Sequence, residues 1–423
     1  MIATVHPNFL KGSITAPPSK SMMQRICALA LLHSGETIIH NPGFSEDDSA
    51  TLRLIECLGA VVDKKSQALH IKSEGMLNIP QEVDFGESGL ACRMFAPILA
   101  LFNKSITLNG KGTLLIRDMS DLMALLSSLD VTINSSTSFL PFEMKGPINT
   151  KEVSIDGSKS SQYITGMIIA CAYSANSPIE LRVFNTVSNP YLNLTLHCLR
   201  TFGYQVEHKN YEHFAINPKI DIGRKVECSI ESDWSSAAYF LVAGVIAGNL
   251  EIKGLDRDSV QADAAILKVL VDAKADIEVG ENSIIVRKTQ NLQSFHFDAT
   301  HSPDLFPILV CLAAFCSGQS SIKGLGRLCN KESNRKDSIL DVFGNLGVDL
   351  TVDGDVLFIN GNSAIRSCQV SAHHDHRMAM SAAIAALRAN GPVTIHQAES
   401  VKKSFPDFFN ALISLGATVS LTH

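Results

Sequence analysis

Eight lysines and arginines lie near apolar stretches at corresponding ends of repeated segments of this chain. They are Lys20, Arg25, Arg93, Arg117, Lys331, Arg335, Arg377 and Lys403. Charge is costly in such surroundings unless something there uses it. Arginine donates paired hydrogen bonds to carboxylate or phosphate, and lysine supplies a compact charge. The set predicts a site for substrates that carry both groups, although any one cation alone fits a solvated loop charge or a structural ion pair.

Two carboxylates stand among these cations and are candidates for proton transfer. Asp304 precedes an apolar stretch, and Glu332 lies inside KESNR. A carboxylate near several cations stays ionised and suits a general base, and a second one can move protons if its surroundings raise its pKa. The alternative for Asp304 is a simple cap on a helix that begins at Leu305.

Neutral hydrogen-bond donors precede another apolar stretch. Ser160, Ser161 and Gln162 lie where a helix is expected to begin. Free N–H groups and hydroxyls at a helix start can bind a phosphate. An ordinary N-cap is an equally good interpretation of either serine.

A metal site is not expected at the histidine-rich segment His373–His376. Its histidines and Asp375 form a single short run without a distant Cys or His signature. GESG and GKG are too short to be nucleotide-binding fingerprints.

A sixfold repeat organises these residues, at intervals of about 70 residues. In each copy a β-like run meets a small or charged cluster and then an apolar stretch. The apolar stretches begin near Met22, Leu90, Gln162, Ala237, Leu305 and Met378. A second helix-like stretch and a hairpin follow, so each unit is expected to read strand, helix, strand, helix, hairpin.

The first helix of each unit is apolar almost all round and is therefore expected in the interior, with sheets outside it. The second helices carry more charge and are expected further out. Helix N-termini that gather at one end carry free N–H groups and partial positive charge, which predicts an anion site.

Six units in 423 residues favour two domains of three units each. The polar segment NPKIDIGRK marks the expected divide. We expect one domain over residues 19–226 and another over 1–18 and 227–423, which the N-terminal strand IATVHP completes.

The charge and the apolar content of the chain exclude some classes of binding partner and location. A net charge of −6 and a pI near 6.2 argue against nucleic acid and membrane surfaces. The longest apolar run, Phe306 to Cys316, is too short for a membrane span, and MIATVHPNF lacks the pattern of a signal peptide, so a cytoplasmic location is expected. The ten cysteines include no C-x-x-C pair and read as reduced core residues, as at Cys27, Cys92, Cys171 and Cys311.

Nine segments in order resemble the 5-enolpyruvylshikimate-3-phosphate synthase family, from about Lys11 to Phe409. They are PPSKSMMQR, DFGESGLACRMFAP, DGSKSSQYITG, SNPYLNLTL, ESDWSSAAYFL, HSPD, KESNRK, DHRMAM and KKSFPDFF. The resemblance implies an inside-out α/β barrel architecture, with two similar domains of three βαβαββ units that close over a cleft. It implies transfer of the enolpyruvyl group of phosphoenolpyruvate to the 5-hydroxyl of shikimate 3-phosphate, in aromatic amino acid biosynthesis. It implies that no cofactor or metal is needed. It also implies that the partners are small molecules and that the protein is a monomer.

The resemblance also implies roles for individual residues. Lys20, Ser21 and Arg25 match the opening substrate motif, and Lys20 touches both ligands. Lys331 matches a contact to the shikimate ligand, as do Ser160, Ser161, Gln162, Ser188 and Tyr191. The phosphoenolpyruvate clamp is matched by Arg117, Arg335, Arg377 and Lys403, with Gly89 packing against that ligand. Asp304 matches the base at the 5-hydroxyl, and Glu332 the group that moves protons at the methylene carbon.

Four positions depart from the usual family pattern: Leu90, Asp118, Asn189 and Asn334. None removes a catalytic group, so we expect activity with altered affinity. Asp118 is expected to loosen the loop of Arg117 or partly neutralise it, and Leu90 leaves glyphosate sensitivity open.

Two alternatives remain. One is an enolpyruvyl transferase acting on UDP-N-acetylglucosamine, which is disfavoured because Ser21 follows Lys20 and because residues 109–120 contain no cysteine. The other is an inactive relative that binds anionic metabolites, which the intact Lys20, Asp304, Glu332 and Arg377 disfavour.

Overall fold

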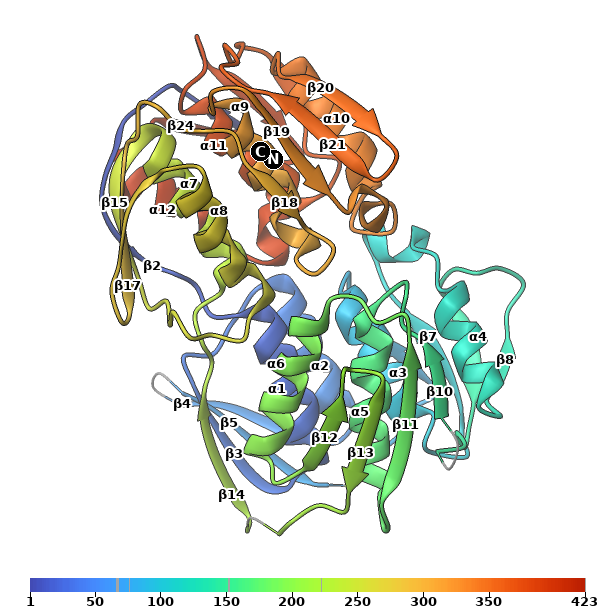
Figure 1. The fold of residues 1–423 in the computed structure, drawn as a ribbon. Helices are drawn as coiled ribbons and strands as arrows, with labels where there is room; N and C mark the ends of the chain where they lie inside the picture. The colour runs from blue at the N-terminus through green and yellow to red at the C-terminus, as the bar shows by residue number, and fades with distance from the viewer. Residues whose placement is uncertain (66–67, 76, 151–152, 222, 423) are drawn as a thin grey trace. The chain divides into compact units, whose positions relative to one another are not determined.

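The computed structural model describes residues 1–65, 68–75, 77–150, 153–221 and 223–422. The chain divides into two compact units. The N-terminal unit is Pro18–Glu231, and the C-terminal unit joins Met1–Pro17 to Ser232–His423. Both units are drawn in Figure 1.

The N-terminal unit contains three four-stranded sheets with the same topology. In each, the first two strands are parallel and the hairpin adds two antiparallel strands. The strand orders are β14 (Lys225–Ser229), β3 (Ser34–His40), β5 (Ala68–Glu74), β4 (Val61–Lys65); β6 (Glu82–Asp84), β7 (Ser105–Asn109), β9 (Phe142–Lys145), β8 (Thr132–Asn134); and β10 (Val153–Asp156), β11 (Ile179–Phe184), β13 (His213–Asn217), β12 (Gln205–Lys209).

The C-terminal unit repeats this arrangement. Its strand orders are β2 (Leu10–Thr15), β15 (Gly248–Lys253), β17 (Ser283–Arg287), β16 (Asp276–Val279); β18 (His296–Asp298), β19 (Gln319–Lys323), β21 (Val356–Asn360), β20 (Asp349–Asp353); and β22 (Gln369–Ser371), β23 (Val393–His396), β1 (Ile2–Val5), β24 (Val419–Thr422). The N-terminal strand β1 thus lies between the last two C-terminal strands and pairs antiparallel with both.

The first and fourth repeats exchange their first strands, which corrects the predicted make-up of these two repeats, although residues 1–17 belong with the C-terminal unit as predicted. The strand before the first helix, β2, pairs with β15, whereas β14, the strand before the fourth helix, pairs with β3. Each sheet has a parallel first strand. In these two sheets that strand comes from the other end of the unit's sequence: β14 is parallel to β3, and β2 is parallel to β15. A boundary after residue 226 would also divide β14, all five of whose residues pair with β3. The functional division of the two domains stays a prediction.

The six first helices lie where the apolar stretches predict them. They are α1 (Lys20–Leu32), α3 (Gly89–Leu99), α5 (Ser161–Ser174), α7 (Trp234–Ala247), α9 (Phe306–Ala314) and α11 (His376–Ala386). Five begin with a side-chain cap. The side chains of Ser19, Ser88, Ser160, Asp233 and Asp375 each accept a hydrogen bond from a backbone N–H two or three residues on. The small or charged clusters of the repeat are therefore helix starts, while α9 begins instead from a 3-10 turn, Pro303–Leu305.

The second helices are α2 (Glu46–Cys57), α4 (Ser120–Ser128), α6 (Asn189–Thr201), α8 (Ile266–Asp272), α10 (Arg335–Asn345) and α12 (Phe408–Ser414). Each keeps exposed residues along one side. The first helices, by contrast, are almost wholly buried and supply much of two separate hydrophobic cores, one in each unit. Strands such as β10 alternate buried and exposed residues, so one sheet face covers the helices. The predicted inside-out α/β architecture is confirmed (Figure 1).

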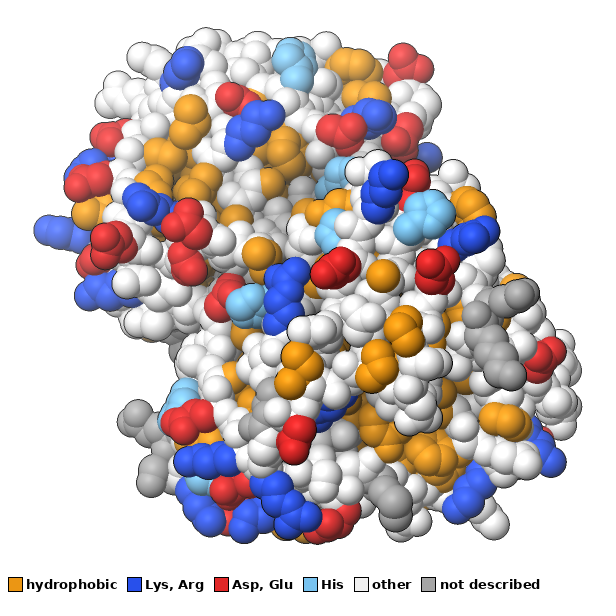
Figure 2. Space-filling model, turned by 60° about the horizontal axis from the view of Figure 1, so that its bottom comes forward, with side chains coloured by type: hydrophobic (Ala, Val, Ile, Leu, Met, Phe, Trp, Pro, Cys, Tyr) orange, Lys and Arg blue, Asp and Glu red, His pale blue; other side chains and the backbone are white. Residues whose placement is uncertain are grey.

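The state of the cysteines and the character of the surface agree with what the composition predicts. All ten cysteines are free, and Cys27, Cys92, Cys171 and Cys311 are buried, as predicted. Among the described residues, we find no helix with the length and apolar character that crossing a bilayer requires. On the face drawn in Figure 2, acidic and basic side chains lie interspersed.

Candidate active site

Lys20 begins α1 and is held by a carboxylate at the start of α2. Its Nζ lies 2.8 Å from Oδ2 of Asp47, and both side chains are largely buried. The next residue, Ser21, turns its carbonyl to the guanidinium of Arg25, which donates to it at 2.7 Å. Two residues of the opening motif, Ser21 and Arg25, therefore bond one another in the first turns of α1.

Arg25 is buried among neutral groups. Nε donates to Oγ1 of Thr195 at 2.9 Å, and Nη2 donates to the carbonyl of Tyr191 at 3.3 Å and to Oγ1 of Thr165 at 3.5 Å. Burial lowers the pKa of Arg25 to about 10, which leaves it charged at neutral pH. A cation solvated by hydroxyls and carbonyls, with no carboxylate in these hydrogen bonds, can attract an anionic ligand.

A second cationic group forms where α3 and α5 begin. Gly89 is the first residue of α3, and a Cβ there would collide with Nη1 of Arg117 and lie 3.0 Å from Nη1 of Arg93. Nη1 of Arg93 donates to Oε1 of Gln162 at 3.1 Å, which joins the two helix starts. Arg117 and Arg93 are both buried, so the solvated-charge interpretation is wrong for them.

The predicted neutral donors lie at helix starts of the N-terminal unit. Ser160 is the N-cap of α5 and accepts from the N–H of Gln162 at 3.1 Å, so the cap interpretation of this serine holds. Ser161 follows it and is buried. Ser188 precedes α6 with a left-handed backbone (φ 58°) and makes no side-chain cap bond there. Its neighbour Tyr191 offers its carbonyl to Arg25.

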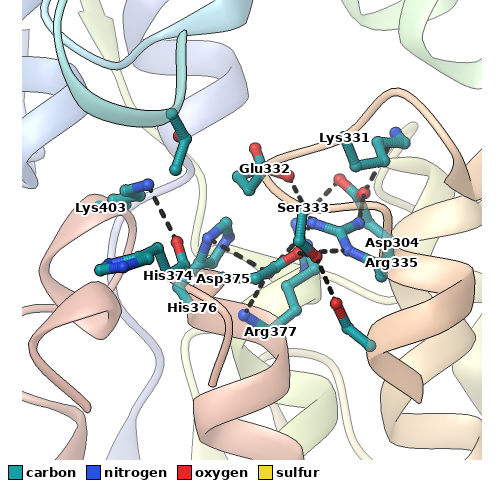
Figure 3. A network of polar contacts seen from close by, with 12 residues as sticks. Asp304, Lys331, Glu332, Ser333, Arg335, His374, Asp375, His376, Arg377 and Lys403 are labelled. Atoms are coloured by element: carbon teal, nitrogen blue, oxygen red, sulfur yellow. Dashed lines mark hydrogen bonds and ion pairs between the residues drawn. The ribbon is translucent and has the colours of Figure 1, made fainter. Parts of the chain in front are cut away.

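In the C-terminal unit, five predicted residues meet in one network (Figure 3). Arg335 is fully buried and lies 3.0 Å from Asp304 and 2.5 Å from Glu332. Asp304 also lies 2.8 Å from Arg377 and 3.4 Å from Lys331. Neither the 3-10 turn that contains Asp304 nor α9 has a side-chain cap, so the cap interpretation of Asp304 is wrong.

The network sets the charge of its members. Burial alone would raise the pKa of Asp304, but Arg377, Lys331 and Arg335 outweigh it and hold this pKa well below its usual value. Burial lowers the pKa of Lys331, and Asp304 partly restores it. Asp304 is therefore a carboxylate in the resting protein, the protonation state that a general base needs.

Two further carboxylates lie at this site, and neither was predicted as a site residue from the sequence. Asp375, the N-cap of α11, is fully buried and accepts from Nε of Arg335 at 2.8 Å and from the N–H of Arg377 at 2.9 Å. Asp263 is buried and accepts from the hydroxyl of Ser235. Burial first and the charge of Asp304 second raise the pKa of Asp263 to about 7. No motif around QAD in the sequence marks Asp263.

Lys403 and the histidine segment lie beside this network. Nζ of Lys403 donates to the carbonyl of His374 at 3.0 Å, and Lys403 is buried. His373 bonds Asp341 at 2.7 Å, and His374 bonds Gln397 at 3.0 Å. No cluster of three potential metal ligands occurs among the described residues.

The four departures fall at helix starts. Asp118 accepts from the N–H and hydroxyl of Ser120 at 3.0 and 2.7 Å, so it braces the turn before α4, contrary to the expected loosening. Asn334 precedes α10 and donates to Asp337. Asn189 begins α6, and its Oδ1 is buried without a hydrogen-bond partner among the described residues. Leu90 is partly exposed at the second position of α3.

Comparison with known proteins identifies this combination of fold and residues. A profile of the family described as EPSP synthase (3-phosphoshikimate 1-carboxyvinyltransferase) matches residues 5–412. The 3-phosphoshikimate 1-carboxyvinyltransferase of Clostridium kluyveri is 32% identical over 418 residues, covering 98% of this chain and 97% of that protein. The enzyme of that name from Thermococcus kodakarensis is 33% identical over 403 residues, covering 95% and 97%.

A solved structure of EPSP synthase from Acinetobacter baumannii has a TM-score of 0.80 over 99% of this chain and all of that one. At 24% identity this likeness shows the fold alone. The resemblance predicted from the motifs is confirmed by the profile and by the two relatives. The chain belongs to the EPSP synthase (3-phosphoshikimate 1-carboxyvinyltransferase) family.

Proposed function

We propose that this protein transfers the enolpyruvyl group of phosphoenolpyruvate to the 5-hydroxyl of shikimate 3-phosphate and releases phosphate. The observation that carries the proposal is Asp304, a carboxylate kept ionised by Arg335, Arg377 and Lys331 in a chain of this family. The reaction is a step of aromatic amino acid biosynthesis.

Binding comes first, because both substrates are anions that repel one another. The C-terminal unit offers Lys331, Arg335, Arg377 and Lys403. In the N-terminal unit the binding groups are Lys20, Ser21, Arg25, Gly89, Arg117, Ser160, Ser161, Gln162, Ser188 and Tyr191. Fixed cations offset the repulsion and hold the reacting atoms in place, a proximity effect worth several kcal/mol of barrier, about 7 to 11 in favourable systems.

Asp304 then accepts the proton of the 5-hydroxyl as its oxygen attacks C2 of phosphoenolpyruvate. A carboxylate with three cationic neighbours is a weak base. A substrate anion that pairs with Arg377 and Lys331 reduces their pull on Asp304, so binding itself raises the pKa of the base. The resting ion pairs are thus compatible with the catalytic role.

Glu332 donates a proton to the methylene carbon, which gives a tetrahedral intermediate with phosphate and the shikimate oxygen on one carbon. Phosphate then leaves as the methyl proton returns to Glu332, which restores the double bond. The proton that Asp304 took from the 5-hydroxyl passes to the departing phosphate, so both carboxyl groups end as they began. The 2.5 Å contact with Arg335 orients Glu332 for this exchange. Lys20, held by Asp47, is the third catalytic group of the proposal and lies beside both ligands.

The test is phosphate release from the purified protein. Both substrates together should release phosphate, and neither alone should. No release by folded protein that still binds shikimate 3-phosphate would support an inactive binder, and release only when UDP-N-acetylglucosamine replaces shikimate 3-phosphate would support the other transferase. Action as a monomer in the cytoplasm stays part of the proposal, and size-exclusion chromatography with light scattering tests the monomer.

A further inference from the structure

The turn before Arg117 is tied to an acidic residue that has no role in the proposed reaction. Glu87 stands just before Ser88, the N-cap of α3. Its Oε2 accepts hydrogen bonds from both the backbone N–H and the hydroxyl of Thr113, each at 2.9 Å. Thr113 lies in the 3-10 turn Gly112–Ile116, and Arg117 follows that turn directly.

The fit between Glu87 and this turn is close. A Cβ built on Gly112 would lie 2.6 Å from Oε2 of Glu87, and Gly112 has a left-handed backbone (φ 50°) that favours glycine. The residue before it, Lys111, donates its N–H to the carbonyl of Gly86 at 2.7 Å. Residues 86–87 are therefore joined to residues 111–113 by one backbone hydrogen bond and by the side chain of Glu87.

Further hydrogen bonds and a packing contact connect this turn to the guanidinium of Arg117. The N–H of Leu114 donates to the carbonyl of Lys111 at 3.1 Å, and the N–H of Arg117 donates to that of Leu114 at 3.3 Å. The end of Arg117 then packs against Gly89, two residues after Glu87. Both ends of the connection from Glu87 to Arg117 are thus fastened at the start of α3.

We propose that Glu87 is a positioning residue that sets the place of Arg117 by anchoring the 3-10 turn through Thr113. This inference rests on the proposed function, in which Arg117 binds phosphoenolpyruvate. The negative charge of an acid near an anion-binding arginine would repel the ligand. In Glu87 the carboxylate instead accepts two hydrogen bonds from Thr113, which gives the acid a structural role at this place. A simple alternative is that Glu87 only stabilises the N-terminus of α3 through the helix dipole.

Steady-state kinetics separate these two roles. Glu87→Ala should raise KM for phosphoenolpyruvate about tenfold, with kcat and the Kd of shikimate 3-phosphate changed less than about threefold. Glu87→Gln keeps the length and an acceptor oxygen, so it should restore KM to within about threefold of the wild type. Thr113→Val removes only the hydroxyl and should raise KM by about threefold, and adding it to Glu87→Ala should raise KM no further.

A measurement independent of activity accompanies the kinetics. Amide hydrogen exchange of residues 112–117 should speed up in Glu87→Ala and stay near wild type in Glu87→Gln. If the wild type releases no phosphate, the proposed function fails, and exchange alone then decides whether Glu87 holds the turn. A lower Tm with unchanged exchange and unchanged KM would overturn the positioning role in favour of the dipole. If Glu87→Ala does not fold, Thr113→Val with unchanged KM and exchange would overturn it as well.

Discussion

At the scale of single residues, the part of the candidate site in the C-terminal unit consists of buried and partly buried charges whose resting partners are one another. Arg335 contacts three carboxylates, and Asp304 contacts three cations. Removing one member of such a set leaves its partners buried without compensation, which is costly. In the proposed function the same arrangement serves binding, because an anionic substrate can replace a carboxylate at Arg377 or Lys331 without first desolvating the cation.

Asp304→Ala should lower kcat at least about 100-fold, because the 5-hydroxyl loses its base. Binding of shikimate 3-phosphate, measured by isothermal titration calorimetry, should remain detectable. Asp341→Ala is the matched control, since it removes an exposed carboxylate of the same unit that pairs with His373. Turnover equal to the wild type in Asp304→Ala would remove Asp304 from the mechanism.

Arg377→Ala should raise KM for phosphoenolpyruvate at least about tenfold, because a buried, charge-assisted contact to that ligand is lost. The Kd of shikimate 3-phosphate should change much less. Arg287→Ala, which removes an exposed arginine of the same unit, is the control. An equal loss of affinity for both ligands would contradict the assignment of Arg377.

Gly89→Ala should raise KM for phosphoenolpyruvate by about tenfold and leave Tm nearly unchanged. The added methyl meets the flexible end of Arg117 rather than backbone, and Gly89 has no left-handed φ to lose. Arg117 must therefore move while the helix stays intact. A variant with normal KM would show that the place of Arg117 does not matter to the ligand; Gly344→Ala, with open space at its Cβ, is the control.

At the scale of elements, five of the short polar clusters of the repeat cap a helix, and candidate binding residues lie beside several of these caps. Asp375 shows the link most clearly, because the side chain that caps α11 also receives Nε of Arg335. A cap satisfies N–H groups that would otherwise be unpaired, and in this site it also fixes the neighbouring cations.

The capping box of α2 predicts a pH-dependent stability. Asp48 accepts from the N–H and the hydroxyl of Ser45, and burial raises its pKa to about 7 from an ordinary value near 3.9. The folded protein thus binds this proton more tightly than the unfolded chain. Its contribution is fully present below about pH 4 and is lost as pH rises to about 7, by a few kcal/mol.

Asp48→Asn keeps the cap but cannot titrate. The free energy of unfolding of the wild type, minus that of the variant, should therefore fall between pH 4 and 7 in urea titrations. Asp63→Asn, which changes an exposed aspartate outside the capping box, is the matched control. A flat difference for Asp48→Asn would mean that Asp48 stays ionised in the fold.

At the scale of the whole molecule, each unit has its own core and its own set of sheets. The N-terminal unit is one continuous stretch of chain, whereas the C-terminal unit needs β1 and β2 from the other end of the sequence. The two units should therefore differ in their ability to fold alone.

Residues 18–231 expressed alone should unfold cooperatively and bind shikimate 3-phosphate detectably by calorimetry, because every strand of their three sheets is present. Residues 232–423 alone lack β1, which lies between β23 and β24, and should not fold cooperatively. Restoring residues 1–17 by fusion should rescue that fragment. A stable fragment 232–423 without them would contradict the role of β1.

The sequence by itself determined the repeat, the buried first helices and the candidate residues, because each depends on local pattern. Apolar periodicity and capping residues are read within one helix, so the helix start at Ser160 could be found in advance. Lys20 and Asp304 could be found because a charge beside an apolar stretch is costly unless it is used. Only the tertiary structure decided the pairing of β14 with β3 and the convergence of Asp263 and Asp375 on the network around Asp304 and Arg335. These depend on contacts between residues far apart in the chain, whose closeness comes from packing and strand register and leaves no local periodic signal.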